Sequence, residues 1–432
     1  MNTVFQGTSG TQYRVLEPAA AKGGEGSIYR IDGRKDIVAK IFAENRRTEQ
    51  RFQKLKVMLQ VPKRDLLQEH LCWPRELLYQ DGKPVGYLMT NLDGYVDLNA
   101  IYSGGYPEIT FYGRVLLAQN LCVAVLSVHE AGQVCGDLNP NNIMVDPKTG
   151  RLMLVDTDSY HIRDLNHNST YRCEVGIPEY LPKELLNKIS GETTFANAPM
   201  PTYTTHTDRF ALGIHIFALL MSGCHPFACA VKKGVSVDTV PQPAENIKSE
   251  FYVFEHCCKT ACENTAGSVS FDRNHMNFTK PVYAPDISFL PDGMRKKFKK
   301  CFVAGNHNPS ERPTEEEWYM ELEGMKQSLS KCEKNALHVY PSHNESCPWC
   351  QILNSMRMAY QVHQEERKET NKQAAKKYEY RRPCPPKTPA PTQNTASANQ
   401  NSSYDNEAEK KTIWYAALAM AGAAILMILL FL

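Results

Sequence analysis

The sequence has no large excess of charge of either sign. Its 432 residues include 49 Lys and Arg against 47 Asp and Glu, which leaves a formal net charge of +2. Domains that bind nucleic acid usually carry a basic patch or stripe. We therefore expect no nucleic-acid partner, and a zinc-dependent nucleic-acid binder is the least favoured class of function.

The first residues also lack the pattern of a secretory signal. Met1–Phe5 shows no charged segment leading into an apolar one. Without such a signal, the 14 cysteines favour reduced thiols or metal ligands over a disulfide framework. The length fits one large domain with appendages.

The most informative pattern is a loop followed by two short apolar runs. The loop carries Asp137 and Asn142 five residues apart, and the second run, Leu152–Val155, leads directly into Asp156. Carboxylates and an amide oxygen are the groups that a magnesium–nucleotide phosphoryl-transfer site needs. The alternative for each residue alone is a turn, because Asn and Asp favour loops.

At these residues the chain resembles the protein-kinase superfamily. Asp137–Asn142 is similar to the catalytic loop, and Asp156-Thr-Asp158 stands where the Asp-Phe-Gly tripeptide is usual. The resemblance implies that Asp137 orients the acceptor hydroxyl and that Asn142 and Asp156 hold magnesium. Asp158 replaces a glycine, and its carboxylate either holds a second metal ion or stiffens the segment.

The resemblance also implies an ATP site within the first hundred residues. Ala21–Tyr29 is similar to the glycine-rich loop, whose glycines let the backbone close over phosphates. The strand-like Asp36–Phe42 matches the Val-Ala-Ile-Lys pattern, although a single lysine on a strand is more often a solvated surface residue. The implied ATP-binding residues are Gly23, Gly24, Gly26, Ile28, Lys40, Met89 and Leu92.

Downstream motifs extend the resemblance to about residue 330. They imply a structural Glu184–Arg312 pair and a buried Asp208 that ties the catalytic loop to a long apolar helix. The implied fold is α+β and bilobal, with a small β-rich N-lobe at residues 12–91 and a larger helical C-lobe at residues 92–330.

A narrower resemblance is carried by three short motifs. Cys173–Pro178, Gly223–Phe227 and Cys347–Cys350 are similar to segments of bacterial kinase-like proteins that are often associated with a PP2C-type phosphatase. Members of that group also have an aspartate-rich sequence in place of Asp-Phe-Gly. The resemblance therefore implies a PP2C-type phosphatase as a partner.

Three departures from the superfamily pattern bear on activity. Gly136 replaces the arginine before the catalytic aspartate, so a phosphorylated activation loop has no obvious anchor. Asn139 replaces a lysine that steadies the transferred phosphoryl group, which should slow the reaction. On the helix after Lys40, the acidic partner of this lysine is unclear, since the expected spacing lands near Lys54 and Glu49 is the only suitable acid.

Residues 331–352 form a predicted zinc knuckle. Cys332, His338, Cys347 and Cys350 have the spacing of a tetrahedral zinc set, and His343 is a competing ligand. The alternative is a pair of ordinary thiols beside a histidine-containing loop. A second cluster has irregular spacing, for which we favour free thiols: His256, Cys257, Cys258 and Cys262.

The remaining residues change character sharply. Residues 353–382 are charged and favour an exposed helix, and residues 383–411 have the composition of a disordered linker. Ile413–Leu432 is 20 residues without a charge, long enough for a transmembrane helix. Lys410 and Lys411 precede it, and the positive-inside rule then keeps the large domain cytosolic. The alternative for this run is a buried core helix.

Together these features predict a membrane-tethered, cytosol-facing protein kinase. It would bind magnesium–ATP, with zinc in the knuckle, and phosphorylate Ser or Thr of protein substrates. The competing prediction is an inactive or weakly active pseudokinase that binds nucleotide and scaffolds partners. Gly136, Asn139 and the missing acidic partner of Lys40 favour that alternative.

Overall fold

The computed structural model describes residues 3–256 and 277–358, together with residues 361 and 369. The chain divides into two compact units, Met1–Ile352 and Leu353–Leu432. Several predictions lie outside the described residues: the linker 383–411, the apolar run 413–432, Cys257, Cys258 and Cys262. Of the predicted helix at 353–382, residues 353–358 are described and are helical.

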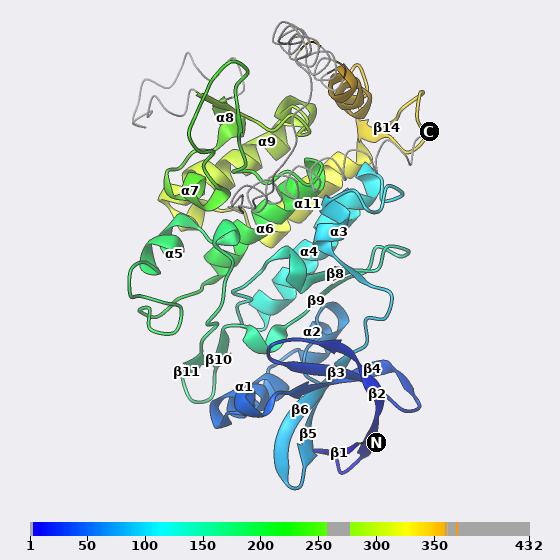
Figure 1. The fold of residues 1–432 in the computed structure, drawn as a ribbon, viewed down its shortest axis with the longest axis vertical. Coiled ribbons are helices and arrows are strands. Elements are labelled where there is room, and N and C mark those ends of the chain that lie inside the picture. The colour runs from blue at the N-terminus through cyan, green and yellow to red at the C-terminus, as the bar shows by residue number, and fades with distance from the viewer. Residues whose placement is uncertain (1–2, 257–276, 359–360, 362–368, 370–432) are drawn as a thin grey trace, which may run out of the picture. The chain divides into compact units, whose positions relative to one another are not determined.

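Six antiparallel strands form a closed barrel in the N-terminal region, drawn in blue in Figure 1. In barrel order the strands are β1 (Val4–Gly7), β2 (Gln12–Lys22), β3 (Gly26–Ile31), β4 (Arg34–Phe42), β6 (Lys83–Thr90) and β5 (Glu76–Gln80). The barrel therefore begins N-terminal to residue 12, where the sequence analysis placed the boundary. Asp81 and Gly82 join β5 to β6 with positive φ at both residues, as a two-residue type I′ hairpin requires.

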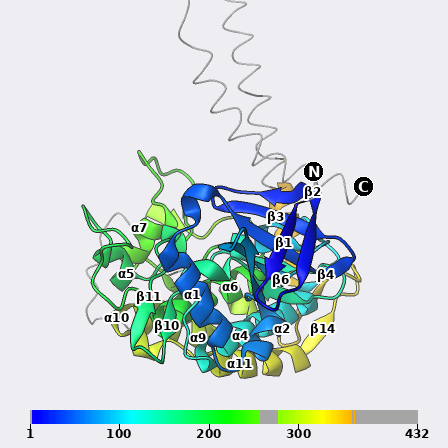
Figure 2. The same cartoon turned by 90° about the horizontal axis from the view of Figure 1, so that it is seen from below.

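Two helices accompany the barrel, α1 (Glu49–Gln60) and α2 (Arg64–His70). Thr48 caps α1 by accepting a hydrogen bond from the Arg51 N–H, and Phe52, Leu55 and Met58 form its buried face. This helix contacts β5 and also the strand β10 (Ile162–Asp164) of the helical region, as the view in Figure 2 shows. α1 thus touches both regions that meet at the site described below.

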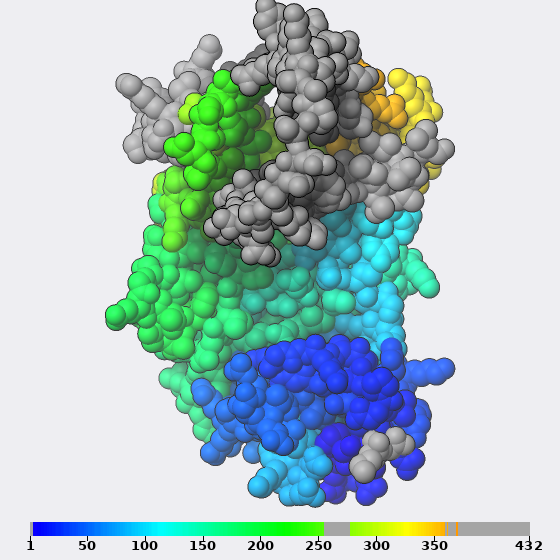
Figure 3. Space-filling model, in the orientation of Figure 1, coloured from blue at the N-terminus to red at the C-terminus, as the bar shows by residue number. Residues whose placement is uncertain are grey.

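The region from residue 92 onward is mainly helical. Its helices are α3 (Leu98–Tyr102), α4 (Phe111–Glu130), α5 (Lys183–Lys188), α6 (Thr205–Leu220), α7 (Pro243–Lys248), α8 (Val253–His256), α9 (Asp292–Lys299), α10 (Gly305–His307) and α11 (Glu315–Gln327). Small sheets complete it: β7 (Val96–Asp97) with β8 (Ile143–Val145) and β9 (Leu152–Leu154), β10 with β11 (Ser169–Tyr171), β12 (Ala230–Val231) with β13 (Phe278–Thr279), and β14 (Leu329–Lys331) with β15 (Val339–Pro341). Figure 3 shows the blue surface of the barrel region meeting the cyan and green surface of this region.

The core of the helical region lies around α4 and α6. A capping box formed by Thr204 and Thr207 starts α6, and Phe217 on this helix packs edge-on against Phe254 and Phe298. Among the described residues, α4 is the helix whose length and apolar composition would suit a membrane span. Most of it is buried within the fold, as a core helix is.

The predicted knuckle packs onto the helical region within the same compact unit. The ring of Trp349 lies 5.4 Å from that of Phe111 on α4 and 5.3 Å from that of Phe289. Its indole N–H donates to the Val339 carbonyl at 2.7 Å. Residues 331–352 are therefore an integral part of this unit.

Candidate phosphoryl-transfer site and metal centre

Lys40 lies on β4 with its ammonium group at the junction of the two regions. The strand places it opposite Tyr87 of β6, and only 8% of the residue is exposed. Its Nζ atom lies 2.8 Å from Asp156 Oδ1 and 2.6 Å from Asp158 Oδ1. Burial opposes the charge on Lys40, but the two carboxylates outweigh it and raise the pKa of the lysine.

The two aspartates differ in their surroundings. The Asp156 side chain is 39% exposed, and its backbone has φ of 57°, a strained conformation for a residue other than glycine. The Asp158 side chain is 2% exposed and also accepts a hydrogen bond of 2.7 Å from the Tyr87 hydroxyl. Between them, Thr157 donates to the Cys72 carbonyl at 3.0 Å and fixes the triplet against the N-terminal region.

The catalytic-loop sequence folds around a buried carboxylate. Asp208 on α6 accepts hydrogen bonds from the backbone N–H groups of Cys135 at 2.7 Å and Gly136 at 2.9 Å. Asn142 donates from Nδ2 to the Asp137 carbonyl at 3.0 Å, and its own carbonyl accepts from the Val155 N–H at 2.9 Å. The loop and the Asp156 segment are therefore joined directly.

Asp137 is half-buried beside these groups. Burial raises the pKa of its carboxyl group. Within the described part of the chain, its Oδ1 atom is buried and makes no well-aligned hydrogen bond. A buried acceptor without a partner is costly unless a ligand supplies the donor, so this oxygen suits an incoming hydroxyl.

The structure gives a reason for the first two departures. Gly136 has φ of +83°, and a Cβ there would lie 2.9 Å from Cys173 Sγ, so an arginine does not fit. Asn139 is 3% exposed and accepts from the Asn141 N–H at 2.9 Å, which caps the short turn Pro140–Asn142. Its side-chain oxygen is thus used inside the loop.

The third departure, the acidic partner of Lys40, is corrected by the structure. Glu49 is exposed at the first residue of α1, whereas Lys40 pairs with Asp156 and Asp158. Toward the site α1 presents Arg51, whose guanidinium lies 3.8 Å from Asp158. The suggestion that Asp158 holds a second metal ion is disfavoured, because its carboxylate already faces Lys40, Tyr87 and Arg51.

The glycine-rich segment connects β2 to β3. At Gly26 a Cβ would lie 2.2 Å from the Ile41 carbonyl, so only glycine fits against β4, whereas Gly23 and Gly24 face open space. Glu25 at the tip forms a two-pronged ion pair with Arg51 at 2.8 and 3.0 Å. The remaining predicted ATP-site residues are Ile28, half-buried on β3, Met89, buried near the end of β6, and Leu92, half-buried two residues beyond that strand.

Glu184 and Arg312 form the implied structural pair. The guanidinium binds both carboxylate oxygens, at 2.7 and 2.8 Å, and also donates to the His206 carbonyl at 2.9 Å. Arg312 is 1% exposed, so a paired geometry with several hydrogen bonds is needed to offset its desolvation.

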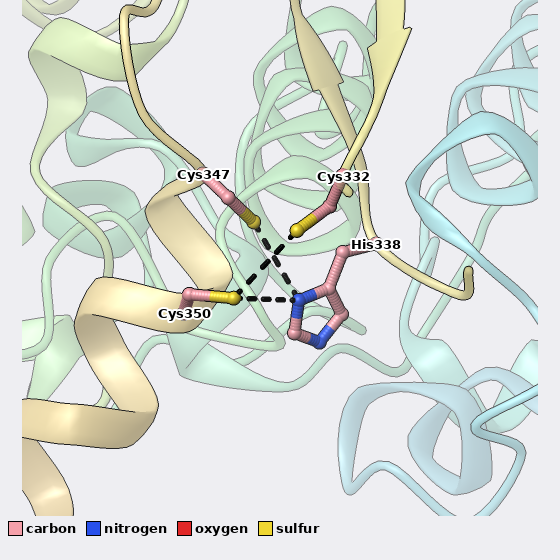
Figure 4. A group of neighbouring side chains, drawn as sticks. All are labelled: Cys332, His338, Cys347 and Cys350. Atoms are coloured by element: carbon pink, nitrogen blue, oxygen red, sulfur yellow. Dashed lines mark hydrogen bonds between the residues drawn. The ribbon is translucent and has the colours of Figure 1, made fainter. Parts of the chain in front are cut away.

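Four side chains of the predicted knuckle converge as Figure 4 shows: Cys332, His338, Cys347 and Cys350. Their ligand atoms all lie within 4.8 Å of one another. Cys332 Sγ is 3.7 Å from Cys350 Sγ, and His338 Nδ1 is 3.5 Å from Cys347 Sγ and 3.4 Å from Cys350 Sγ. Tetrahedral zinc, with bonds of about 2.3 Å to sulfur and about 2.0–2.1 Å to nitrogen, requires separations of about 3.8 Å (S···S) and about 3.5 Å (S···N).

The hairpin β14–β15 explains why His338 joins this cluster rather than His343. The Cys332 N–H donates to the His338 carbonyl at 2.9 Å, which places the two residues side by side. Asn335 Nδ2 lies 3.4 Å from His338 Nε2, the nitrogen that faces away from the cysteines. The spacing of the four residues therefore corresponds to a preformed ligand set.

Sequence reasoning did not single out several residues that shape the site. They are Glu25, Arg51, Tyr87, His129 and Glu315. Glu25 could have been noticed because it interrupts a glycine-rich turn. The others are single polar residues within strands and helices, and only their tertiary neighbours distinguish them.

The barrel with its buried lysine, joined to a helical region that supplies Asp137, Asn142 and Asp156, has the arrangement of a protein-kinase-like α+β fold. No protein-family model matches the chain. The chain is similar to "Protein kinase YegI" of Escherichia coli K12, with 28% identity over 360 residues, 80% of this chain and 50% of the relative. The protein of the same name from Escherichia coli O157:H7 is 28% identical over 346 residues, 77% of this chain and 48% of that relative.

A shorter match joins the chain to a eukaryotic kinase. Over 150 residues it is 31% identical to the human "Citron Rho-interacting kinase", covering 35% of this chain and 6% of that protein. The chain spans about half the length of the YegI relatives. These comparisons support a protein-kinase-like fold.

Proposed function

We propose that this chain is an ATP- and magnesium-dependent protein kinase that phosphorylates Ser or Thr. The observation that carries the proposal is the convergence of Lys40, Asp137, Asn142 and Asp156 from different elements. Lys40 contacts Asp156 at 2.8 Å, and Asn142 links the Asp156 segment to Asp137 through hydrogen bonds of 2.9 and 3.0 Å. Relatives named protein kinase supply independent support.

Each of these four residues has a separate role in the proposed reaction. Lys40 pairs with phosphate oxygens of the nucleotide, and Asp137 orients the acceptor hydroxyl through its free Oδ1 atom. The donor set suits magnesium, because Asp156 is partly exposed and Asn142, donating through Nδ2, keeps its amide oxygen for the metal. When bound, magnesium neutralises charge that develops on the phosphates. Lys40 would then exchange its contact with Asp156 for one with the nucleotide, while its contact with Asp158 stays.

The second candidate function is a nucleotide-binding scaffold. The buried Asn139 favours it, because the position supplies no cation for the transferred phosphoryl group. Nucleotide binding without transfer is the behaviour that distinguishes the scaffold from the kinase.

One experiment separates these functions. We expect Asp137→Asn to leave magnesium–ATP affinity within a few-fold while phosphate transfer to a protein acceptor falls by about 100-fold or more. Calorimetric titration and a transfer assay measure the two quantities. Asp146→Asn, at an exposed turn carboxylate bonded to Thr149, is the matched control and should change neither. Equal background transfer by the wild type and Asp137→Asn would leave the scaffold as the function.

We also propose that the four knuckle ligands hold one zinc ion. The ligand separations support this, and a closed site with three cysteines and one histidine is typical of structural zinc. Zinc here would tie the loop between β14 and β15, which carries Cys332 and His338, to Cys347 and to Cys350 in the helix that begins at residue 348.

The remaining parts of the proposal rest on the sequence alone. The uncharged Ile413–Leu432 run supports a membrane tether that keeps the kinase-like domain in the cytosol. The similarity of Cys173–Pro178 and the terminal Cys-Pro-Trp-Cys to phosphatase-associated kinases supports a PP2C-type partner.

A further inference from the structure

At the junction of the two regions, α1 carries positive charges where a negative charge was expected. An acid was expected on the helix after Lys40, but α1 presents the cations Arg51 and Lys54 toward the site. The acids come instead from the glycine-rich segment, through Glu25, and from the Asp156-Thr-Asp158 triplet. The charged groups connect Glu25 to Arg51, Arg51 to Asp158, and Lys40 to both Asp158 and Asp156.

Asp158 occupies the centre of this chain of charges. Its carboxylate contacts the Lys40 ammonium at 2.6 Å and the Tyr87 hydroxyl at 2.7 Å, with Arg51 at 3.8 Å. A 2% exposed carboxylate with these partners is held by several charge-assisted contacts, which are strong in a buried setting. Its partners already surround it, so a metal ion would have to displace Lys40 or Arg51.

We propose that Asp158 is the positioning residue for Lys40 and takes the role of the absent acid on α1. Arg51 links Asp158 to the glycine-rich loop by pairing with Glu25. The inference rests on the proposed nucleotide site. It assigns the two aspartates separate roles. Asp156, partly exposed, releases Lys40 to the nucleotide and binds the metal, whereas Asp158 keeps the ammonium group in place throughout.

The two roles differ in their dependence on magnesium. A positioning residue for Lys40 supports ATP binding whether or not the metal is present, because the lysine contacts phosphate directly. A metal ligand affects only the additional affinity that magnesium supplies. ATP affinity should therefore be measured by competition with a fluorescent nucleotide, once with saturating magnesium and once with a chelator.

We expect Asp158→Asn to weaken ATP binding by about 10- to 100-fold under both conditions, as the loss of a contact to a buried charge implies. Asp156→Asn should reduce affinity only in the presence of magnesium. Lys40→Ala should reproduce the metal-independent loss of ATP affinity. Adding Asp158→Asn to Lys40→Ala should cause little further loss, because both changes remove the same interaction, the Lys40–Asp158 pair. Asp36→Asn, which removes an exposed acid on the same strand paired with Arg34, is the matched control and should bind normally.

The outcomes distinguish this inference from the proposed function. A loss in Asp158→Asn confined to magnesium-containing solution, or independent losses in the double variant, would overturn the positioning role. Wild-type protein that binds ATP without transferring phosphate would overturn the kinase proposal alone, whereas no ATP binding would overturn both. If Asp158→Asn does not fold, Tyr87→Phe takes its place in the same measurements, because this change removes only the hydroxyl group that donates to Asp158. We then expect a smaller loss of ATP affinity, again independent of magnesium.

Discussion

At the residue scale, Gly136 shows how one departure from a motif is compensated by packing. Because Gly136 has no Cβ, Cys173 in the segment Arg172–Val175 can lie against the catalytic loop. The same segment is held by the Tyr203 hydroxyl, which donates to the Val175 carbonyl at 2.6 Å, and by Arg172, which donates to the Ala198 carbonyl at 2.6 Å. These contacts join the segment to Tyr203 and Ala198 through protein groups alone.

We predict that Gly136→Ala destabilises the protein through both strain and a clash. The left-handed conformation costs a non-glycine residue about 1–2 kcal/mol, and overpacking against Cys173 costs about 1–3 kcal/mol more. Gly150→Ala is the matched control, because Gly150 also has positive φ (+72°) but meets nothing within 4 Å. Urea unfolding measures both. Equal losses in the two variants would mean that Cys173 moves aside freely.

At the element scale, α4, α6 and α11 are joined by a buried histidine. His129 on α4 contacts Asp208 on α6 and Glu315 on α11, each at 3.0 Å. Burial opposes protonation, but the hydrogen bond to Asp208 and the neighbouring charge of Glu315 outweigh it and raise the pKa of His129 to about 9. Asp208 in turn holds the catalytic loop, so the charge on His129 bears on the site.

We predict that this charged histidine makes stability fall at alkaline pH. Because its folded pKa is raised, the contribution is complete below about pH 6.5 and is lost as the pH rises through about 9. The free energy of unfolding should drop over that window by up to about 3 kcal/mol more in the wild type than in His129→Gln. His167→Gln, at an exposed histidine paired with Asp164, is the control and should follow the wild type. Parallel pH profiles for wild type and His129→Gln would contradict the assignment.

The knuckle gives a second prediction at the element scale. The purified protein should contain one zinc per chain, and Cys347→Ser combined with Cys350→Ser should lose it, because two thiolates are removed from one closed set. Metal analysis measures the content, and Cys229→Ser, at a half-buried cysteine outside the cluster, is the control. Zinc retained in the double variant would place the metal elsewhere, with Cys257 and Cys258 as the next cysteines to test.

At the scale of the whole molecule, the barrel region and the helical region are joined at the triplet Asp156-Thr-Asp158. The Cys72 N–H donates to the Leu154 carbonyl at 2.8 Å, and Thr157 donates to the Cys72 carbonyl at 3.0 Å. Lys40 adds its two ion pairs across the same junction. The position of the triplet is thereby set by both regions at once.

We predict that the full chain is an integral membrane protein. The uncharged Ile413–Leu432 run should keep it with membranes through high-salt and carbonate washes, because burial of apolar surface does not depend on the screening of charges. A truncation before Lys410 should become soluble, and fractionation with immunodetection follows both. Release of the full chain from membranes by high salt alone would show that electrostatic attraction, and not an inserted helix, keeps it there.

Local sequence predicted much of the site, but not the partners of its charged residues. Lys40 and Asp156 could be found because each lies in or just after a short apolar strand. The roles of Arg51 and Asp158 could not be predicted, because they depend on contacts between residues more than a hundred positions apart in the sequence. The cluster of three cysteines and one histidine was predictable, since its four residues lie within one short segment.

Several features can be recognised in the sequence alone: the order of the motifs, the strand-like runs of the N-terminal region, and the spacing of the knuckle ligands. The Asp81-Gly82 turn is also a local signal, although the sequence analysis did not single it out. These follow from local rules: apolar periodicity, turn chemistry and ligand spacing. Three other features depend on the folded chain: Asp158 pairs with Lys40, Gly136 makes room for Cys173, and the Asn139 side chain is buried. The physical reason is that burial and long-range pairing fix the free energy of a charged or polar side chain, and neither is a property of its sequence neighbours.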